Sequence, residues 1–188
     1  MKNTLLVIAI LAIVSCKQQE GANVQTAPTQ VGIDAVVTEN GDLNVTDAVE
    51  DVTFKTEEAS QIHASYLMLK GALVNTNAKE AAQEAAKFKD VLDAQVESDI
   101  TRNLSDDLAL ISMSKDAAEQ RVAFENISKK VEVYLSSEIT SGTIYKQYCP
   151  MAFEGKGAYW LSNSKEIRNP YYGDKMLKCG VVDKEIQQ

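Results

Sequence analysis

Between residues 57 and 135, apolar side chains recur every three or four positions, and this period constrains the fold more than any other feature of the chain. Such spacing places the apolar side chains on one face of an α-helix. No proline and only one glycine, Gly71, interrupts it. Four such stretches with short connections predict a mostly α-helical protein, an antiparallel four-helix bundle. The expected inward-facing residues are Ile62, Tyr66, Leu69 and Leu73; Ala81, Ala85, Phe88, Leu92 and Val96; Ile100, Leu104, Leu108 and Ile111; and Phe124, Ile127, Val131 and Tyr134.

Two of the helix starts carry capping signals. Asn77, followed three residues later by Glu80, is typical of a capping box that opens the second helix. Ser114 precedes the fourth stretch, and its hydroxyl can accept a hydrogen bond from a free backbone N–H. We therefore expect Ser114 to cap the fourth helix.

The first sixteen residues have the pattern of an export signal. Lys2 gives a short positive start, residues 5–14 are apolar but too few to span a membrane, and Cys16 follows Ser15. This arrangement resembles the lipobox of bacterial lipoproteins, in which the cysteine is lipidated and begins the mature chain. The alternative is an ordinary signal peptide with an incidental cysteine. Because Lys17 follows the cysteine rather than Asp, the lipoprotein interpretation favours the outer membrane, with the protein facing the periplasm.

Residues 17–56 are rich in Gln, Thr, Asn, Asp and Gly and contain no sustained helical period. A segment of this composition buries too little apolar surface to offset the entropy of ordering it. We expect a flexible tether over residues 17–56 and a folded helical-bundle domain over residues 57–188. The alternative is that part of the tether packs on the domain as an additional pair of strands.

The charge balance excludes some classes of function. The chain has 27 acidic and 19 basic residues, a net charge of -8, so a nucleic-acid partner is not expected. No Ser-His-Asp grouping, phosphate-binding loop or metal-hydrolase motif is visible, and we expect a protein that is not an enzyme.

After Gly142 the sequence predicts an irregular C-terminal extension that carries a sulfur motif, residues 142–183. It is rich in aromatic residues and turn formers, and only Thr143 to Tyr148 reads as a short strand. Two stretches pair a cysteine with a methionine: "YCPMAF" holds Cys149 and Met151, and "KMLKCG" holds Met176 and Cys179.

The residue types in this motif allow three interpretations. Four soft sulfur donors favour Cu(I) or Ag(I) over hard cations, and zinc sites make no use of methionine. On an extended strand Cys149 and Met151 would lie on one side, and Met176 and Cys179 would share one side of a helical turn. A disulfide between Cys149 and Cys179 is equally allowed outside the cytosol and would contribute roughly 3–4 kcal/mol. The third interpretation is that the four residues are ordinary core.

A family resemblance bears on this choice. The stretch "CPMAFEGKGAYWLSNSKEIRNPYYGDKMLKCG", with "YLMLKGALVN" and "QRVAFENISKKV" before it, is similar to the bacterial family named domain of unknown function 3347. That family occurs alone or fused to efflux adaptors of the copper/silver type. The resemblance implies a copper-handling module that faces the periplasm. It also implies that Cys149, Met151, Met176 and Cys179 are the candidate ligands.

Four further residues are candidates for the wall of such a site. Trp160 could cover a bound cuprous ion through a cation–π contact, although a lone tryptophan is more often a core anchor. Tyr171 and Tyr172 are expected to form a turn and to pack on the bundle. His63, the sole histidine, could supply an additional ligand, but on an apolar helix it is more often hydrogen-bonded or partly exposed.

The sequence thus favours a lipid-anchored Cu(I)- or Ag(I)-binding accessory protein that delivers metal to an efflux adaptor. The alternative is a non-catalytic interaction module stapled by a Cys149–Cys179 disulfide. The sequence disfavours a third interpretation, a thiol redox protein, because the cysteines lie thirty residues apart rather than in a Cys-x-x-Cys motif.

Overall fold

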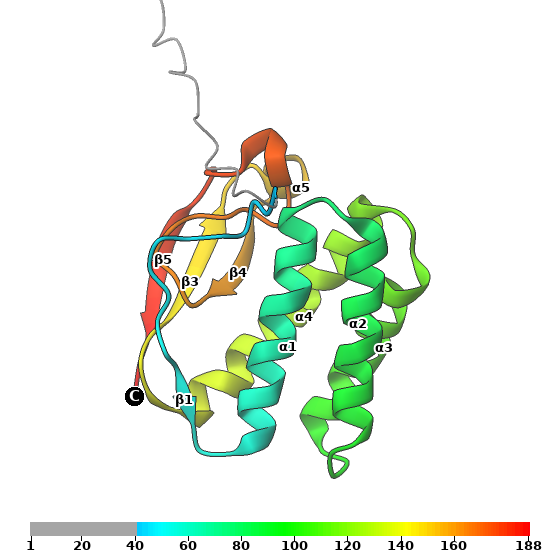
Figure 1. The fold of residues 1–188 in the computed structure, drawn as a ribbon, viewed down its shortest axis with the longest axis vertical. Helices are drawn as coiled ribbons and strands as arrows, with labels where there is room; N and C mark the ends of the chain where they lie inside the picture. Colours follow the sequence, from blue (N-terminus) through cyan, green and yellow to red (C-terminus); the bar gives the residue numbers. More distant parts are fainter. Residues whose placement is uncertain (1–40) are drawn as a thin grey trace, which may run out of the picture. The chain divides into compact units, whose positions relative to one another are not determined.

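The computed structural model describes residues 41–188, which form four long helices and two small antiparallel sheets (Figure 1). The predicted signal peptide, the lipidated Cys16 and residues 17–40 of the predicted tether lie outside the described residues. The helices are α1 (Glu57–Val74), α2 (Ala78–Asp93), α3 (Asp99–Met113), α4 (Ala117–Glu138) and the short α5 (Ala152–Gly155), with a 3-10 turn η1 (Gly173–Met176). The strands are β1 (Thr53–Phe54), β2 (Ile139–Ser141), β3 (Ile144–Cys149), β4 (Ala158–Ser162) and β5 (Val181–Ile186).

The predicted helical stripes are largely the buried residues of α1 to α4. Consecutive helices pack on one another and α4 also packs on α1, as expected of amphipathic helices that share one apolar core. The prediction fails at Val96, whose side chain is 88% exposed, because α2 ends at Asp93 and the chain turns before the stripe reaches it.

The helix starts follow from local hydrogen bonds. The side chain of Asn77 accepts a hydrogen bond from the backbone N–H of Glu80, which confirms the predicted cap of α2. The prediction for Ser114 was wrong, because Asp116 caps α4 by accepting from the N–H of Ala118. A carboxylate is the better acceptor at the positive end of a helix. Ser114 instead ends α3.

The C-terminal part is more regular than the irregular extension that we expected. Strands β3, β4 and β5 form a three-stranded antiparallel sheet in the order β4-β3-β5. Pro150 and the glycines at 155 and 157 belong to the connection between β3 and β4. These turn formers therefore join two strands of one sheet. Because the segment is rich in turn formers, its composition predicted irregular structure instead of a sheet.

Residues 41–56 pack on the helices and strands that follow them. The folded part therefore begins before residue 57, and the predicted tether over residues 17–56 is too long. The N–H of Leu43 donates to the side chain of Asn75, and the N–H of Glu50 donates to the carbonyl of Asn163. Strand β1 then pairs with β2. The contacts come from residues distant in the sequence, which composition alone does not reveal.

Five aromatic residues join the helices to the three-stranded sheet. This aromatic cluster consists of Tyr66, Phe124, Phe153, Trp160 and Tyr171, with neighbouring ring centroids 5.2 to 6.0 Å apart. The hydroxyl of Tyr66 contacts Ser128 of α4 and accepts a hydrogen bond from the N–H of Leu161 in β4. One buried tyrosine thus connects two helices to the sheet.

Within residues 41–188, none of the helices has both the length and the apolar character that crossing a membrane needs.

We predict that Tyr66→Phe lowers the free energy of unfolding by about 1–3 kcal/mol, because it leaves the buried Leu161 N–H without its acceptor and removes the contact with Ser128, whose hydroxyl keeps its bond to the carbonyl of Phe124. Chemical denaturation measures this loss. Tyr172→Phe is the control, because it removes one exposed hydrogen bond, to the carbonyl of Met151. Equal losses in the two variants would contradict the role given to Tyr66.

Candidate cysteine site

The structure brings Cys149 and Cys179 together. Their sulfur atoms lie 3.4 Å apart, and both are free thiols. Cys149 is fully buried and Cys179 is partly buried, so the pair has one enclosed side and one side closer to solvent. Two thiols at this distance can form a disulfide or bind one soft cation together.

Strand β3 places the first cysteine. Cys149 is the last residue of β3 and lies opposite Ala158 of β4, whose small side chain leaves room for the sulfur. Gln147, two residues earlier and therefore on the same face of the strand, lies opposite Trp160. The side chains of Cys149, Gln147 and Trp160 are all fully buried.

The second cysteine lies in the loop between η1 and β5. The N–H of Cys179 donates to the carbonyl of Met176 over 3.0 Å. Gly180 follows with φ of 151°, and a Cβ there would come within 2.9 Å of the Trp160 ring. A side chain at position 180 would therefore push the Cys179 loop away from the sheet.

Asn169 closes this loop from within. Its side chain is fully buried, accepts hydrogen bonds from the N–H groups of Tyr171 and Tyr172, and donates to the carbonyl of Cys179 over 2.8 Å. In the sequence, Asn169 stands out only as part of the Asn-Pro-Tyr-Tyr-Gly motif. An asparagine before proline is a turn signal, but nothing in the sequence indicates a bond to a residue ten positions away.

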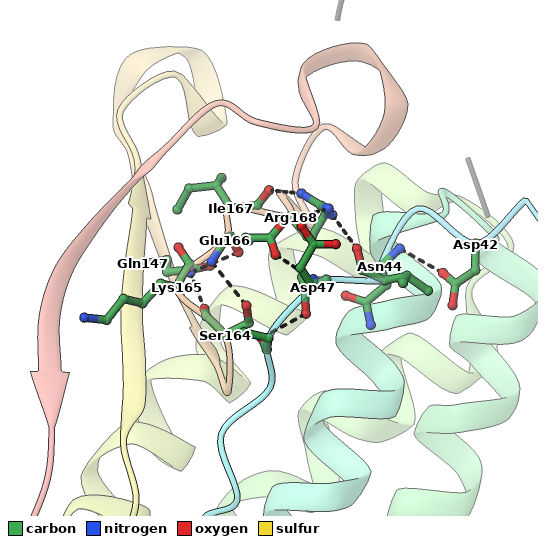
Figure 2. A network of polar contacts seen from close by, with 12 residues as sticks. Asp42, Asn44, Asp47, Gln147, Ser164, Lys165, Glu166, Ile167 and Arg168 are labelled. Carbon is green, nitrogen blue, oxygen red and sulfur yellow. Dashed lines mark hydrogen bonds and ion pairs between the residues drawn. The ribbon is translucent and has the colours of Figure 1, made fainter. Parts of the chain in front are cut away.

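A polar network anchors the segment that precedes Asn169 (Figure 2). The side-chain amide of Gln147 donates to the carbonyls of Ser164, Lys165 and Glu166 at 2.8 to 3.3 Å. Arg168 donates to the carbonyl of Val45 over 2.9 Å and pairs with the carboxylate of Glu166 over 3.0 Å. Strand β3 and the segment around residue 45 therefore hold the loop from two sides.

Met151 is placed differently from the arrangement that the sequence suggested, whereas the expected turn from Met176 to Cys179 is present. The strand ends at Cys149, and Met151 adopts helical rather than extended backbone angles, so alternation along a strand does not apply to Met151. Met151 is 52% exposed, whereas Met176 ends η1 and is partly buried. Within residues 41–188, no hydrogen bond joins either methionine sulfur to the cysteine pair.

The predicted wall residues lie in three different environments. The side chains of Trp160 and Tyr171 are buried in the aromatic cluster, with ring centroids 6.0 Å apart. The hydroxyl of Tyr172 donates to the carbonyl of Met151 over 2.7 Å, which ties the two halves of the motif together. His63 lies in α1 against the ring of Phe54 in β1, with centroids 5.1 Å apart, and not with the cysteines.

The electrostatics of the site favour the neutral thiol of Cys179. Burial and then the neighbouring Cys149 raise the pKa of Cys179 to about 11. A cation that binds here must therefore displace a proton at neutral pH. Within the described residues, no group of three or more His, Cys, Asp and Glu side chains is arranged to hold a metal ion.

Residues 62–142 match a family model described as "Protein of unknown function (DUF3347)". The predicted resemblance to this family is confirmed over residues 62–142. The DUF3347 match begins in α1 and ends after β2, so it covers the helices and stops before Cys149. The cysteine site thus lies outside the part of the chain that the DUF3347 model matches. Comparison with curated proteins and with solved structures gives no match.

His63 generates a prediction on the stability of the fold. Burial, with Lys70 as the second cause, lowers the pKa of His63 from 6.5 to about 4, and its Nε2 atom is buried without a hydrogen-bond partner. Between these two pKa values the unfolded chain binds a proton that the folded chain does not bind. This contribution to stability is complete above pH 6.5 and is lost as the pH falls towards 4.

We expect His63→Gln to flatten the pH dependence of unfolding. Between pH 7 and pH 5 the wild-type chain should lose about 2 kcal/mol more stability than the variant. Urea unfolding at both pH values measures the difference. Parallel pH profiles for the two proteins would show that His63 does not titrate with a lowered pKa.

Proposed function

We propose that this chain binds a soft monovalent cation, Cu(I) or Ag(I), through Cys149 and Cys179. The observation that carries the proposal is the 3.4 Å separation of the two sulfur atoms, which come from a strand end and a loop thirty residues later. Thiolate donors select soft cations over hard ones such as Mg²⁺ or Ca²⁺. Burial of Cys149 adds a low-dielectric environment that excludes competing water.

The geometry also bears on the number of ligands. With two metal–sulfur bonds of about 2.3 Å, the length of a zinc–thiolate bond, a sulfur separation of 3.4 Å would enclose an angle of about 95° at the metal. A linear two-coordinate site would require the sulfurs to move apart, whereas a bent arrangement leaves room for further donors. Met176, three residues before Cys179, and the exposed Met151 are the candidates to supply them.

We also propose a membrane setting for this site. Lipidation of Cys16 would anchor the protein to the outer membrane, facing the periplasm, and residues 17–40 would act as the tether. The four helices, proposed as a four-helix bundle, would support the site without a catalytic role. Metal would leave by ligand exchange with a partner such as an efflux adaptor. Exposure of Met151 supports this step, because exchange needs one ligand within reach of the acceptor.

The same distance favours a second candidate, a structural disulfide. The sulfurs need to approach from 3.4 Å to about 2.05 Å to bond, which a small loop movement can supply. The protein would then be a stapled module that binds a protein partner without metal. Oxidation removes one hydrogen from each thiol, and the oxidised pair offers no thiolate to a cation, so the two functions exclude one another at a given moment.

We predict that the full chain binds one equivalent of Cu(I) or Ag(I) under reducing, anaerobic conditions. Cys149→Ser and Cys179→Ser should each abolish tight binding, and Met176→Leu should weaken binding about tenfold if the thioether completes the site. Competition with a chromophoric chelator measures the affinity. Cys16→Ser is the matched control and should bind as the wild type does. Unchanged affinity in both cysteine-pair variants would refute the proposal.

Oxidation should join Cys149 to Cys179 and raise the free energy of unfolding by roughly 3–4 kcal/mol, because the bond closes a loop of about thirty residues. Denaturation with and without reductant measures the gain, and Cys149→Ser should show none. The redox state in the native host decides between the two functions. A fully linked pair there would favour the stapled module, and free thiols would favour the metal site.

A further inference from the structure

We propose that Asn169 is a positioning residue that sets how readily Cys179 meets Cys149. Its side-chain amide would determine the thiol–disulfide equilibrium of the pair and, resting on the proposed function, the readiness of the pair to close on a soft cation. Asn169 itself contacts no sulfur in any hydrogen bond of residues 41–188, so it acts through the backbone of the loop.

The oxygen and the nitrogen of the Asn169 side-chain amide bind different parts of the loop. The oxygen accepts from the N–H groups of Tyr171 and Tyr172 at 2.8 and 3.2 Å, which fixes the turn after Pro170. The nitrogen donates to the carbonyl of Cys179 over 2.8 Å. Only the second bond reaches the cysteine site, so a substitution can remove it and leave the first in place.

The backbone of Asn169 closes the same loop at two further points. Its N–H donates to the carbonyl of Leu177 over 2.8 Å, and its carbonyl accepts from the N–H of Gly173 over 3.0 Å. The segment from Gly173 to Cys179 is thereby wrapped around one buried residue. Cys179 lies two residues before Val181, where β5 begins, so the bond to its carbonyl limits how far the thiol can move away from β3.

A continuous path connects this residue to the strand that carries the other thiol. Gln147 of β3 holds the carbonyls of residues 164–166, and Arg168, next to Asn169, is held by Val45 and Glu166 (Figure 2). Gln147 lies two residues before Cys149 on the same face of the strand. The two cysteines are therefore placed by one connected set of buried and partly buried polar contacts that ends in the Asn169–Cys179 bond.

The test is the equilibrium of the full chain with glutathione, without metal. One molecule of glutathione disulfide takes up the two hydrogens of the Cys149 and Cys179 thiols and becomes two molecules of reduced glutathione, and one protein disulfide forms. The ratio of oxidised to reduced protein gives the equilibrium constant. Cys16→Ser is introduced throughout so that only this pair reacts.

Two variants remove the bond to Cys179. Asn169→Asp keeps an acceptor for Tyr171 and Tyr172 but places a carboxylate against the Cys179 carbonyl. Asn169→Ser is uncharged, can still cap the turn through its hydroxyl, and is too short to reach Cys179. We expect each to lower the equilibrium constant about tenfold, the factor that corresponds to one buried hydrogen bond. Fluorescence of Trp160, the sole tryptophan and fully buried, reports whether each variant is folded.

Asn75→Asp is the matched control. Asn75 also uses both ends of its amide, accepting from the N–H of Leu43 and donating to Asp42, but it holds residues 42–43 and not the cysteine loop. A purely structural effect would lower the stability of all three variants and leave the glutathione equilibrium of the folded protein unchanged. An unchanged equilibrium in folded Asn169→Ser, or an equal shift in Asn75→Asp, would overturn the inference.

The outcome is separable from that of the proposed function. If the wild-type chain binds no Cu(I) or Ag(I) but the Asn169 variants shift the glutathione equilibrium, the metal proposal fails and the positioning role stands. If the wild type binds metal and the variants leave the glutathione equilibrium unchanged, the positioning role fails and the metal proposal stands.

Discussion

The aromatic cluster is the contact on which the remaining architecture depends. Tyr66 and Phe124 come from helices α1 and α4, Trp160 from strand β4, and Tyr171 from the loop that leads to Cys179. Their edge-to-face and stacked contacts bury large apolar areas at one point. Each such ring pair contributes more to stability than the burial of its apolar area alone. Because the same rings touch the helices, the sheet and the loop, the position of the cysteine site is tied to the packing of the helices.

The aromatic cluster places the sheet against the helices, and polar contacts then fix the orientation of the loops near the cysteines. Apolar packing is non-directional and tolerates small shifts, whereas hydrogen bonds fix the direction of individual groups. Gln147 orients the loop after β4, and Asn169 orients the loop before β5. Apolar packing and directed hydrogen bonds together explain how two thiols from distant parts of the sequence lie 3.4 Å apart without a covalent link.

Much of the helical part could be predicted from the sequence, because a period of three and four residues is a local signal with one structural meaning. The site could be predicted only in part. The pairing of Cys149 with Cys179 followed from residue types and is present as a close contact. The expected convergence with Met151 rested on an extended strand, but the strand ends at Cys149, and Met151, two residues later, has helical backbone angles. Asn169 and residues 41–56 act through partners far along the chain, which no local pattern reports.

The central claim is that a soft cation binds at a sulfur site built on Cys149 and Cys179. X-ray absorption spectroscopy on the full chain, loaded anaerobically with one equivalent of Cu(I), tests it directly. The account predicts sulfur as the only element bonded to copper, and loss of that signal in Cys149→Ser. Nitrogen or oxygen neighbours, or a spectrum that is the same in the variant, would contradict it.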